Sequence, residues 1–216
     1  MIFPRDHGRM VPYRDQIRKE QTTMFLDQVK KARSHRGFRR ERKVRREELR
    51  YLVECARFTP SARNGQVLKY YLANEEETVA SILALTRWAG ALPELKLPRE
   101  GAEPQAFVVI CLDKNLTDSP AAFQRDVGIV AQTMFLAAGE LGLNGCMIGS
   151  FEAGNLKKLL GLPENLAPQL LLALGEGTDS IVVTDAGPDG NINYFRDDRD
   201  VHYVPKRTME SLIING

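Results

Sequence analysis

One nearly unbroken apolar segment, AFVVICLD at residues 106–113, constrains the fold more than any other feature of the chain. A strand that lacks polar alternation is buried on both of its faces. The segment APQLLLALGEG at residues 167–177 has the same character. Helical patterns alternate with these and shorter strand patterns, so we expect a sheet sandwiched by helices, in the α/β or α+β class.

Two helices are predicted from an apolar face at helical spacing. One starts near Met24, and the other is ended by Pro60. Their apolar faces consist of Phe25, Leu26 and Val29 in the first helix, and of Leu49, Leu52, Val53 and Ala56 in the second.

Two further helices are predicted from their caps. One covers residues 74–90, with Asn74 as N-cap, and the other runs from about Pro120 to Leu141. The second carries apolar or small residues almost all round, so we expect it at the centre of the fold. Short strands are predicted at residues 67–73 and 146–151, and the polar tail that follows residue 193 shows no clear element.

Composition is that of an ordinary globular protein. The 216 residues carry a formal net charge of +2, so no strong field points to nucleic acid. Three cysteines without CxxC spacing indicate buried free thiols, and three scattered histidines show no metal-ligand spacing. The first ten residues contain no signal-like apolar segment, and no apolar run is long enough to span a membrane. We therefore expect a cytoplasmic protein.

Four short segments carry candidate binding groups. Arg33, Ser34 and Arg36 offer two guanidinium groups and a hydroxyl, which suit a phosphate. The loop TPSARNGQ at residues 59–66 offers amide donors and acceptors for a heteroaromatic ring. The others are GCMIGS at residues 145–150, with exposable backbone N–H groups, and the cations Lys206 and Arg207. Each segment has an ordinary structural interpretation when taken alone.

Together and in this order, the four segments resemble the nitroreductase family of FMN-dependent oxidoreductases. The family's R-R-S-x-R/K-x-F run is matched at residues 32–38, and its P-S-x-x-N-x-Q-P loop at residues 60–67. An acidic D-x-G at residues 126–128, the G-C-x-I-G turn at residues 145–149 and the terminal basic pair complete the pattern. The resemblance covers residues 24–216, expected to form one FMN-binding domain after an N-terminal extension of residues 1–23.

The resemblance implies an α+β fold with a central mixed sheet, and an intertwined homodimer with FMN at the subunit interface. NAD(P)H would supply hydride, and a nitroaromatic, a quinone or a similar electron-poor small molecule would accept electrons in ping-pong fashion. No catalytic side chain is expected, because the flavin carries the chemistry. The implied cofactor-binding residues are Arg33, Ser34, Arg36, Pro60, Ser61, Asn64, Gln66, Ile148, Gly149, Ser150, Lys206 and Arg207.

Among these residues, the resemblance assigns Arg33, Ser34, Lys206 and Arg207 to the FMN phosphate and Arg36 to the N1/C2=O edge of the flavin. The loop residues would reach the ring from the partner subunit, and the backbone at Gly149 or Ser150 would lie near N5. Residues 88–104 could cover the substrate, with Trp88 either stacking on it or closing a helix end. His202 is expected in a solvated loop.

Two departures from the family pattern occur at Ala32, where an Arg is usual, and at Val67, where a Pro is usual. An alternative function is nucleic-acid or acidic-partner binding through the basic residues 30–50. That segment lacks interleaved aromatic residues and is interrupted by Glu41, Glu47 and Glu48. A flavin-fragmenting or dehalogenating relative is a third possibility, for which no added motif is present.

Overall fold

The computed structural model describes residues 24–90 and 95–215, and the chain divides into a unit of residues 1–31 and a unit of residues 32–216. In the first unit, residues 24–31 form the predicted helix, on which Met24, Phe25 and Leu26 are exposed. The expected extension at residues 1–23 lies outside the described residues.

The larger unit is built on a four-stranded antiparallel sheet with the strand order β1-β2-β4-β3. The parallel pairing expected of a mixed sheet is limited, among the described residues of this sheet, to one bridge between Ser34 and Gly145. Helices and an antiparallel sheet together confirm the α+β class. The strands are β1 Leu68–Ala73, β2 Ala106–Asp113, β3 Asn144–Ile148 and β4 Leu166–Gly175.

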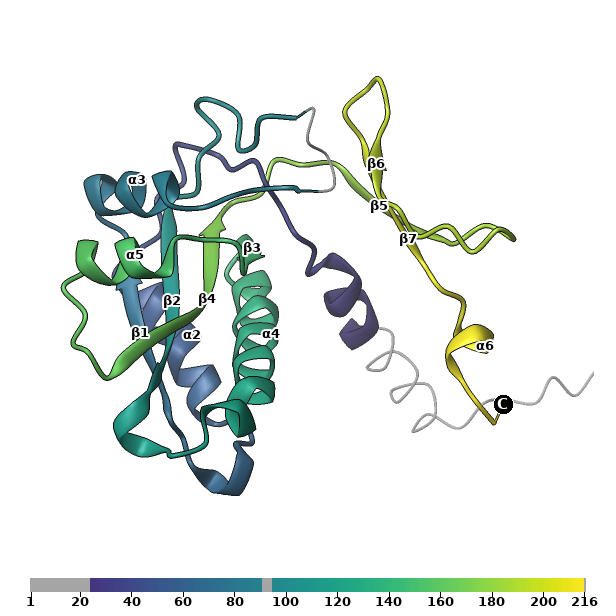
Figure 1. Cartoon of the computed structure of the whole chain (residues 1–216). Coiled ribbons are helices and arrows are strands. Elements are labelled where there is room, and N and C mark those ends of the chain that lie inside the picture. The colour runs from purple at the N-terminus through teal and green to yellow at the C-terminus, as the bar shows by residue number, and fades with distance from the viewer. Residues whose placement is uncertain (1–23, 91–94, 216) are drawn as a thin grey trace, which may run out of the picture. The chain divides into compact units, whose positions relative to one another are not determined.

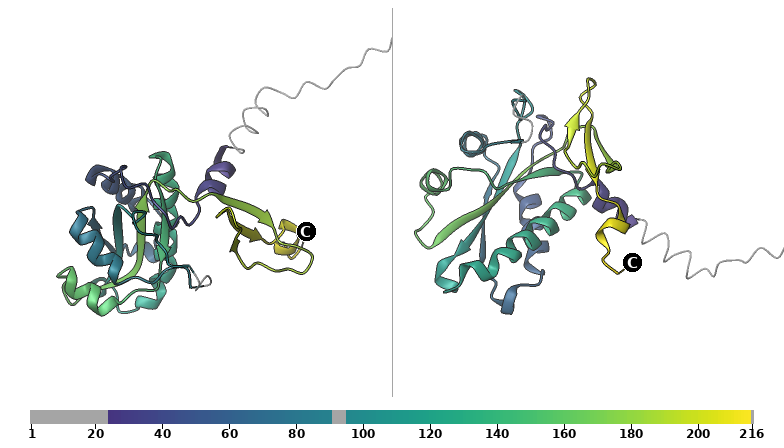
Figure 2. Two further views of the ribbon diagram at one scale, coloured as in Figure 1. Left: turned by 90° about the horizontal axis from the view of Figure 1, so that it is seen from above. Right: turned by 45° about the vertical axis from the view of Figure 1, so that its right-hand side comes forward.

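Helices cover both faces of this sheet (Figures 1 and 2). Val108 and Ile110 of β2 pack on one face with α2 and α4, whereas Phe107 and Val109 pack on the other with α3 and α5. The apolar segment at residues 106–113 is therefore buried on both faces, as predicted. The helices are α2 Arg46–Arg57, α3 Glu76–Ala84, α4 Gln124–Glu140 and α5 Ala153–Leu159.

A buried carboxylate fixes the start of α2. Glu48 accepts a hydrogen bond from the guanidinium of Arg42 and another, 2.8 Å long, from the backbone N–H of Arg45. These bonds, that from Arg42 foremost, lower the pKa of Glu48 to about 2. Arg42 and Arg45, from the basic run before α2, are therefore engaged in capping this helix.

The start of α3 differs from the prediction. Its N-cap is Glu75, and the side-chain amide of Asn74 instead donates to the carbonyl of Val44 at 3.2 Å. The helix ends at Ala84, because Thr86 forms a β-bridge with Phe151. The predicted N-cap and length were therefore wrong, since contacts with distant segments determine both.

The long helix α4 follows a 3-10 turn at Pro120–Phe123 and is ended by Gly142, whose φ is +69°. Ala131 and Met134 are fully buried on one side. The opposite side is exposed, with Ile129 at 39%. In the single chain α4 therefore packs into the core with one face, as expected of a central helix, and its other face is uncovered.

The C-terminal segment forms a second, three-stranded sheet that the sequence did not predict (Figure 1). Its order is β5-β7-β6, with β5 parallel to β7 and β6 antiparallel to it. The strands are short and half exposed, so they lack an apolar run that could have indicated them. The elements are β5 Ile181–Asp185, β6 Phe195–Arg196, β7 His202–Lys206 and a helix α6 Met209–Leu212.

Cys111 and Cys146 are buried free thiols, as predicted, and Cys55 is half-buried. Burial raises the pKa of the Cys111 thiol to about 11, so it stays protonated. None of the helices in the described ranges has the length and hydrophobicity needed to span a bilayer.

Candidate functional site

The segment at residues 33–38 lies between β3 and the chain that follows β4. On one side, Ser34 bridges to Gly145 and the N–H of His35 donates to the Gly145 carbonyl at 2.8 Å. On the other side, Phe38 forms an antiparallel bridge with Gly177. The backbone of the predicted phosphate-binding segment is therefore held from both sides.

Asp179 holds the centre of this segment. Its Oδ2 accepts hydrogen bonds from the backbone N–H groups of Arg36, at 2.5 Å, and Gly37, at 3.0 Å. Its Oδ1 accepts a 2.6 Å bond from Nη2 of Arg196. Burial alone would raise the pKa of Asp179, but the hydrogen bonds from Arg36 and Arg196 outweigh burial and lower it.

The guanidinium of Arg36 contacts two aromatic side chains. Its Nη1 is 3.5 Å from Nε2 of His202, and its central carbon is 5.4 Å from the centre of the Tyr194 ring. Its Nε is buried and, within the described part of the chain, has no hydrogen-bond partner. A cation in this position is available to an anionic or carbonyl acceptor.

Two histidines are buried beside Arg36. His202 is 3% exposed and begins β7, so the expectation of a solvated loop histidine was wrong. Burial, and then the charges of Arg36 and Arg196, lower its pKa to about 4. Burial also lowers the pKa of His35, although Asp179 lies 3.8 Å from its Nδ1 and opposes this. Both rings are therefore neutral near neutral pH.

The end of β3 presents open backbone. Ile148 is 3% exposed and closes the strand, and Gly149 and Ser150 follow it at the surface. A Cβ built on Gly149 would meet no described atom within 4 Å. The Ser150 carbonyl accepts from Arg87 N–H at 2.9 Å, which anchors the turn.

The loop at residues 59–66 is fixed to α4 by Asp126. Ser61 Oγ donates to Asp126 Oδ2 at 2.6 Å and accepts from the N–H of Gln66 at 3.0 Å. The N–H of Ala62 lies 3.2 Å from the same carboxylate oxygen. The Ser61 hydroxyl therefore organises the loop from inside.

The backbone of this loop is in a rarely occupied conformation. Arg63, Asn64 and Gln66 have φ values of 53°, 53° and 47°, in the left-handed region that disfavours side chains. The side-chain amide of Gln66 donates to Oδ1 of Asn64 at 3.0 Å. The loop thus holds two exposed amide side chains together, at a cost in backbone strain.

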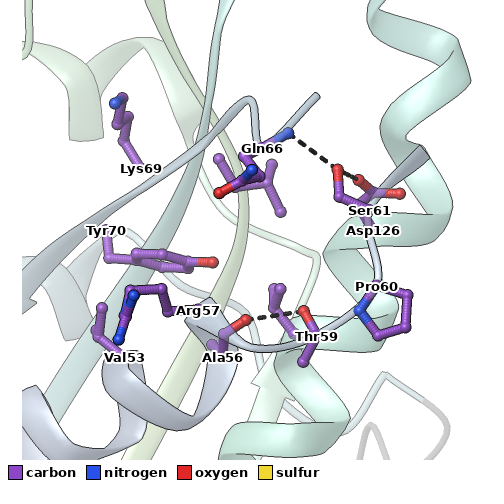
Figure 3. Close-up of a pocket in the computed structure, with 12 residues that line it drawn as sticks. Val53, Ala56, Arg57, Thr59, Pro60, Ser61, Gln66, Lys69, Tyr70 and Asp126 are labelled. Atoms are coloured by element: carbon purple, nitrogen blue, oxygen red, sulfur yellow. Dashed lines mark hydrogen bonds between the residues drawn. The ribbon is translucent and has the colours of Figure 1, made fainter. Parts of the chain in front are cut away.

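A cavity of about 260 Å³ opens between this loop, α2, β1 and α4 (Figure 3). Burial, and then the charge of Asp126, raise the pKa of the Tyr70 phenol on its wall to about 12. Cavities for whole cofactors usually exceed about 300 Å³, so this one suits part of a ligand. Its lining residues are Val53, Ala56, Arg57, Thr59, Pro60, Ser61, Gln66, Leu68, Lys69, Tyr70, Asp126 and Val130.

Val67, which departs from the family pattern, is fully buried with Leu112 and Phe123. Its carbonyl accepts the N–H of Asp113 at 2.9 Å. The apolar side chain fixes the exit of the loop into β1, a role for which a Pro is not needed.

The two predicted halves of the site lie at opposite ends of the sheet. Leu68, next to the loop, pairs with Leu112 of β2. Gly145, next to Ser34, pairs with Leu174, which pairs with Ala106 at the other end of β2. Six strand residues at about 3.3 Å each separate the two ends by ~20 Å. One chain therefore does not bring the loop to the Arg33–Arg36 segment.

Lys206 and Arg207 form a third group. Lys206 pairs with Asp185 at the far end of β7, and Arg207 follows it at the surface. Four residues of strand, ~13 Å, separate Lys206 from His202. Within this chain the basic pair does not contact Arg36.

Sequence analysis missed the buried cluster of Asp179 and Arg196. Asp179 comes four residues after the end of the apolar strand β4, where polar ligand-positioning residues commonly occur, and that was the signal available. Arg196 lies in β6, which had no recognisable pattern. Their burial depends on contacts between distant segments.

Trp88 and the basic segment at residues 30–50, for which other roles were considered, make structural contacts. Trp88 packs against the α3–α5 side of the core, and its Nε1 donates to Thr86 at 2.7 Å, which favours packing over substrate stacking. Residues 91–94 of the expected covering loop lie outside the described residues. In the basic segment, Arg39 pairs with Glu176 at 2.8 Å and Arg46 donates to the Leu72 carbonyl. These contacts weaken the nucleic-acid alternative.

The chain is similar to a known family and to solved structures. The sequence model described as "Nitroreductase family" matches residues 29–176. A curated protein of Archaeoglobus fulgidus, provisionally named NADH dehydrogenase/NAD(P)H nitroreductase, is 24% identical over 144 residues, or 64% of this chain and 78% of its own.

Solved structures share the fold. A nitroreductase family protein from Streptococcus pneumoniae aligns with a TM-score of 0.62 at 18% identity, over 76% of this chain and 96% of its own. A Clostridium difficile nitroreductase described as FMN-dependent aligns with a TM-score of 0.57 at 19% identity, over 71% of this chain and 88% of its own.

Proposed function

The chain belongs to the nitroreductase family of oxidoreductases, and from this premise we propose that it is an FMN-dependent enzyme. In this proposal it takes hydride from NAD(P)H and reduces an electron-poor small molecule such as a nitroaromatic or a quinone. The observation that carries the proposal is the Arg33–Arg36 segment, held along β3, which leads to the open backbone at Gly149.

The residues present fit FMN. The buried Nε of Arg36 has no hydrogen-bond partner among the described residues and would suit a carbonyl edge that gains negative charge. Ser34 is exposed next to Arg33, which is the donor set that a phosphate needs. The absence of a side chain at Gly149 leaves room for a flat ring to approach the backbone.

When bound, FMN would supply the hydride and electron transfer that no side chain of the chain can perform. Arg33, Ser34, Lys206 and Arg207 would hold its phosphate, and Arg36 would stabilise negative charge on the ring. The backbone at Ile148–Ser150 would support the reactive edge. Pro60, Ser61, Asn64 and Gln66 would orient the ring from a second subunit.

The distance between the two proposed halves of the site supports a homodimer. The loop and the Arg33–Arg36 segment are ~20 Å apart in one chain, so two copies are needed to complete one site. The exposed face of α4, which includes Ile129, is available for this contact. We also propose a cytoplasmic location for the enzyme.

The test is spectroscopic. Purified protein should be yellow, should release FMN and not FAD when denatured, and should oxidise NAD(P)H when an acceptor is added. Colourless protein that does not take up added FMN would contradict the proposal. RNA binding that weakens with salt, in protein without FMN, would favour the alternative.

A further inference from the structure

We propose that Asp179 is the positioning residue that sets the FMN-binding segment in its binding conformation, an inference that rests on the proposed function. Asp179 lies outside the sequence segments that resemble the family pattern. It lies on the chain that follows β4, and it acts through the backbone of residues 36 and 37.

Both oxygens of the Asp179 carboxylate accept hydrogen bonds. Its side chain is 6% exposed, and one oxygen receives the N–H groups of Arg36 at 2.5 Å and Gly37 at 3.0 Å. The other oxygen receives Nη2 of Arg196 at 2.6 Å. Three partly buried donors therefore converge on one side chain.

The chain that follows β4 packs closely against the backbone of Gly37. The N–H of Thr178 donates to the carbonyl of Gly37 at 3.0 Å. A Cβ on Gly37 would lie 2.9 Å from Oγ1 of Thr178, so a larger residue here would require the Thr178 side chain to move. Asp179 therefore occupies the end of this paired region that is next to Arg36.

Two consequences follow for the ligand. Because the N–H groups of Arg36 and Gly37 are fixed, the direction in which the Arg36 side chain leaves the backbone is fixed before FMN arrives. Because Asp179 pairs with Arg196, its charge is already balanced and does not withdraw the Arg36 guanidinium from a ligand. Preorganisation of this kind raises affinity by lowering the entropy cost of binding.

Asp200 provides a matched control. Its Oδ1 accepts from Nη1 of the same Arg196 at 3.0 Å, but it accepts no hydrogen bond from residues 36 or 37, and its side chain is 43% exposed. Replacing either aspartate removes one negative charge beside Arg196. Only the replacement of Asp179 removes the acceptor for the two backbone N–H groups.

The experiment compares wild type with Asp179→Ala, Asp179→Asn and Asp200→Asn. FMN affinity is measured by quenching of flavin fluorescence on titration into FMN-free protein, and amide hydrogen exchange is followed in the same protein. We expect Asp179→Ala to weaken FMN binding about tenfold or more. Asp179→Asn, which keeps one acceptor oxygen, should bind with intermediate affinity, and Asp200→Asn should stay within about twofold of wild type.

Exchange at the N–H groups of Arg36 and Gly37 should accelerate in both Asp179 variants without FMN, and the absorption spectrum of the residual bound flavin should shift. Unchanged affinity in Asp179→Ala, or equal losses in Asp179→Asn and Asp200→Asn, would overturn the inference. If Asp179→Ala does not fold, Asp179→Asn against Asp200→Asn decides. Failure of wild type to bind FMN would instead reject the proposed function.

Discussion

At the scale of single residues, Arg36 joins a fixed backbone to a side chain with unused hydrogen-bonding capacity. The sequence predicted that this residue would matter, because its motif combines charged and neutral donors. It did not predict that Asp179, far along the chain, holds its backbone. Local patterns indicate the residue that we propose faces the ligand, whereas the contacts that hold its backbone come from segments distant in the sequence.

Replacement of Arg36 by alanine should weaken FMN binding and slow reduction by NAD(P)H. A charge-assisted hydrogen bond is worth ~1.5–3 kcal/mol, so the dissociation constant should rise roughly tenfold or more. Flavin titration and stopped-flow reduction provide the measurement. Arg40→Ala, an exposed cation four residues away, is the control and should match wild type. Equal FMN affinity in both variants would remove Arg36 from the site.

Ser61 should prove more important for the loop than for direct contact with a ligand. Ser61→Ala removes the bond to buried Asp126 and the acceptor for the Gln66 N–H. We expect the free energy of unfolding to fall by ~1–3 kcal/mol, as measured by chemical denaturation. Ser81→Ala removes only an exposed bond within α3 and should change little. An unchanged free energy of unfolding in Ser61→Ala would show that the loop does not depend on this hydroxyl.

At the scale of elements, segments with a dense local pattern were predictable. The strand β2 was recognised from its apolar run and α2 from its buried face, and both are confirmed. The N-cap of α3 was wrong because Asn74 bonds to a distant carbonyl. The C-terminal sheet was missed because its short, half-exposed strands are stabilised by pairing between residues far apart in sequence.

The cap of α2 provides a test at this scale. Glu48→Ala should lower the free energy of unfolding by ~1–3 kcal/mol, because it leaves the partly buried Arg42 without its carboxylate. Glu47→Ala, on the exposed side of the same turn, is the matched control. Because the pKa of Glu48 is lowered from 4.5 to about 2, its contribution is present above pH 4.5 and is lost as pH falls toward 2. Thermal unfolding of both variants across this pH range would reveal the contribution of Glu48. Identical dependence of the unfolding temperature on pH in the two variants would contradict its role in the cap.

At the scale of the whole molecule, His202 makes stability depend on pH where the C-terminal sheet meets the Arg36 segment. Its native pKa of about 4 lies below its ordinary value of 6.5, so between these values the unfolded chain binds a proton that the native chain does not. Stability should therefore fall as pH drops through this window, on the order of 2 kcal/mol from this group.

His202→Gln should flatten that dependence. Denaturant unfolding at about pH 7 and pH 5 should show a smaller difference for the variant than for wild type. The charges facing the ring are Arg36, Arg196, Asp179 and Asp200, and all remain in the variant. His35, whose pKa burial also lowers, contributes to the dependence that is left. An equal difference in both proteins would show that His202 does not titrate in this way.

We propose that two chains complete each FMN site, since the loop and the Arg33–Arg36 segment lie at opposite ends of the sheet. This proposal is tested most directly by differently tagged subunits produced together, one with Arg33→Ala and Arg36→Ala, the other with Asn64→Ala and Gln66→Ala. Each variant alone should bind little FMN. The isolated mixed dimer should regain half of the wild-type FMN content, because one of its two sites is then intact. A mixed dimer with no more FMN than its parents would contradict a site shared between subunits.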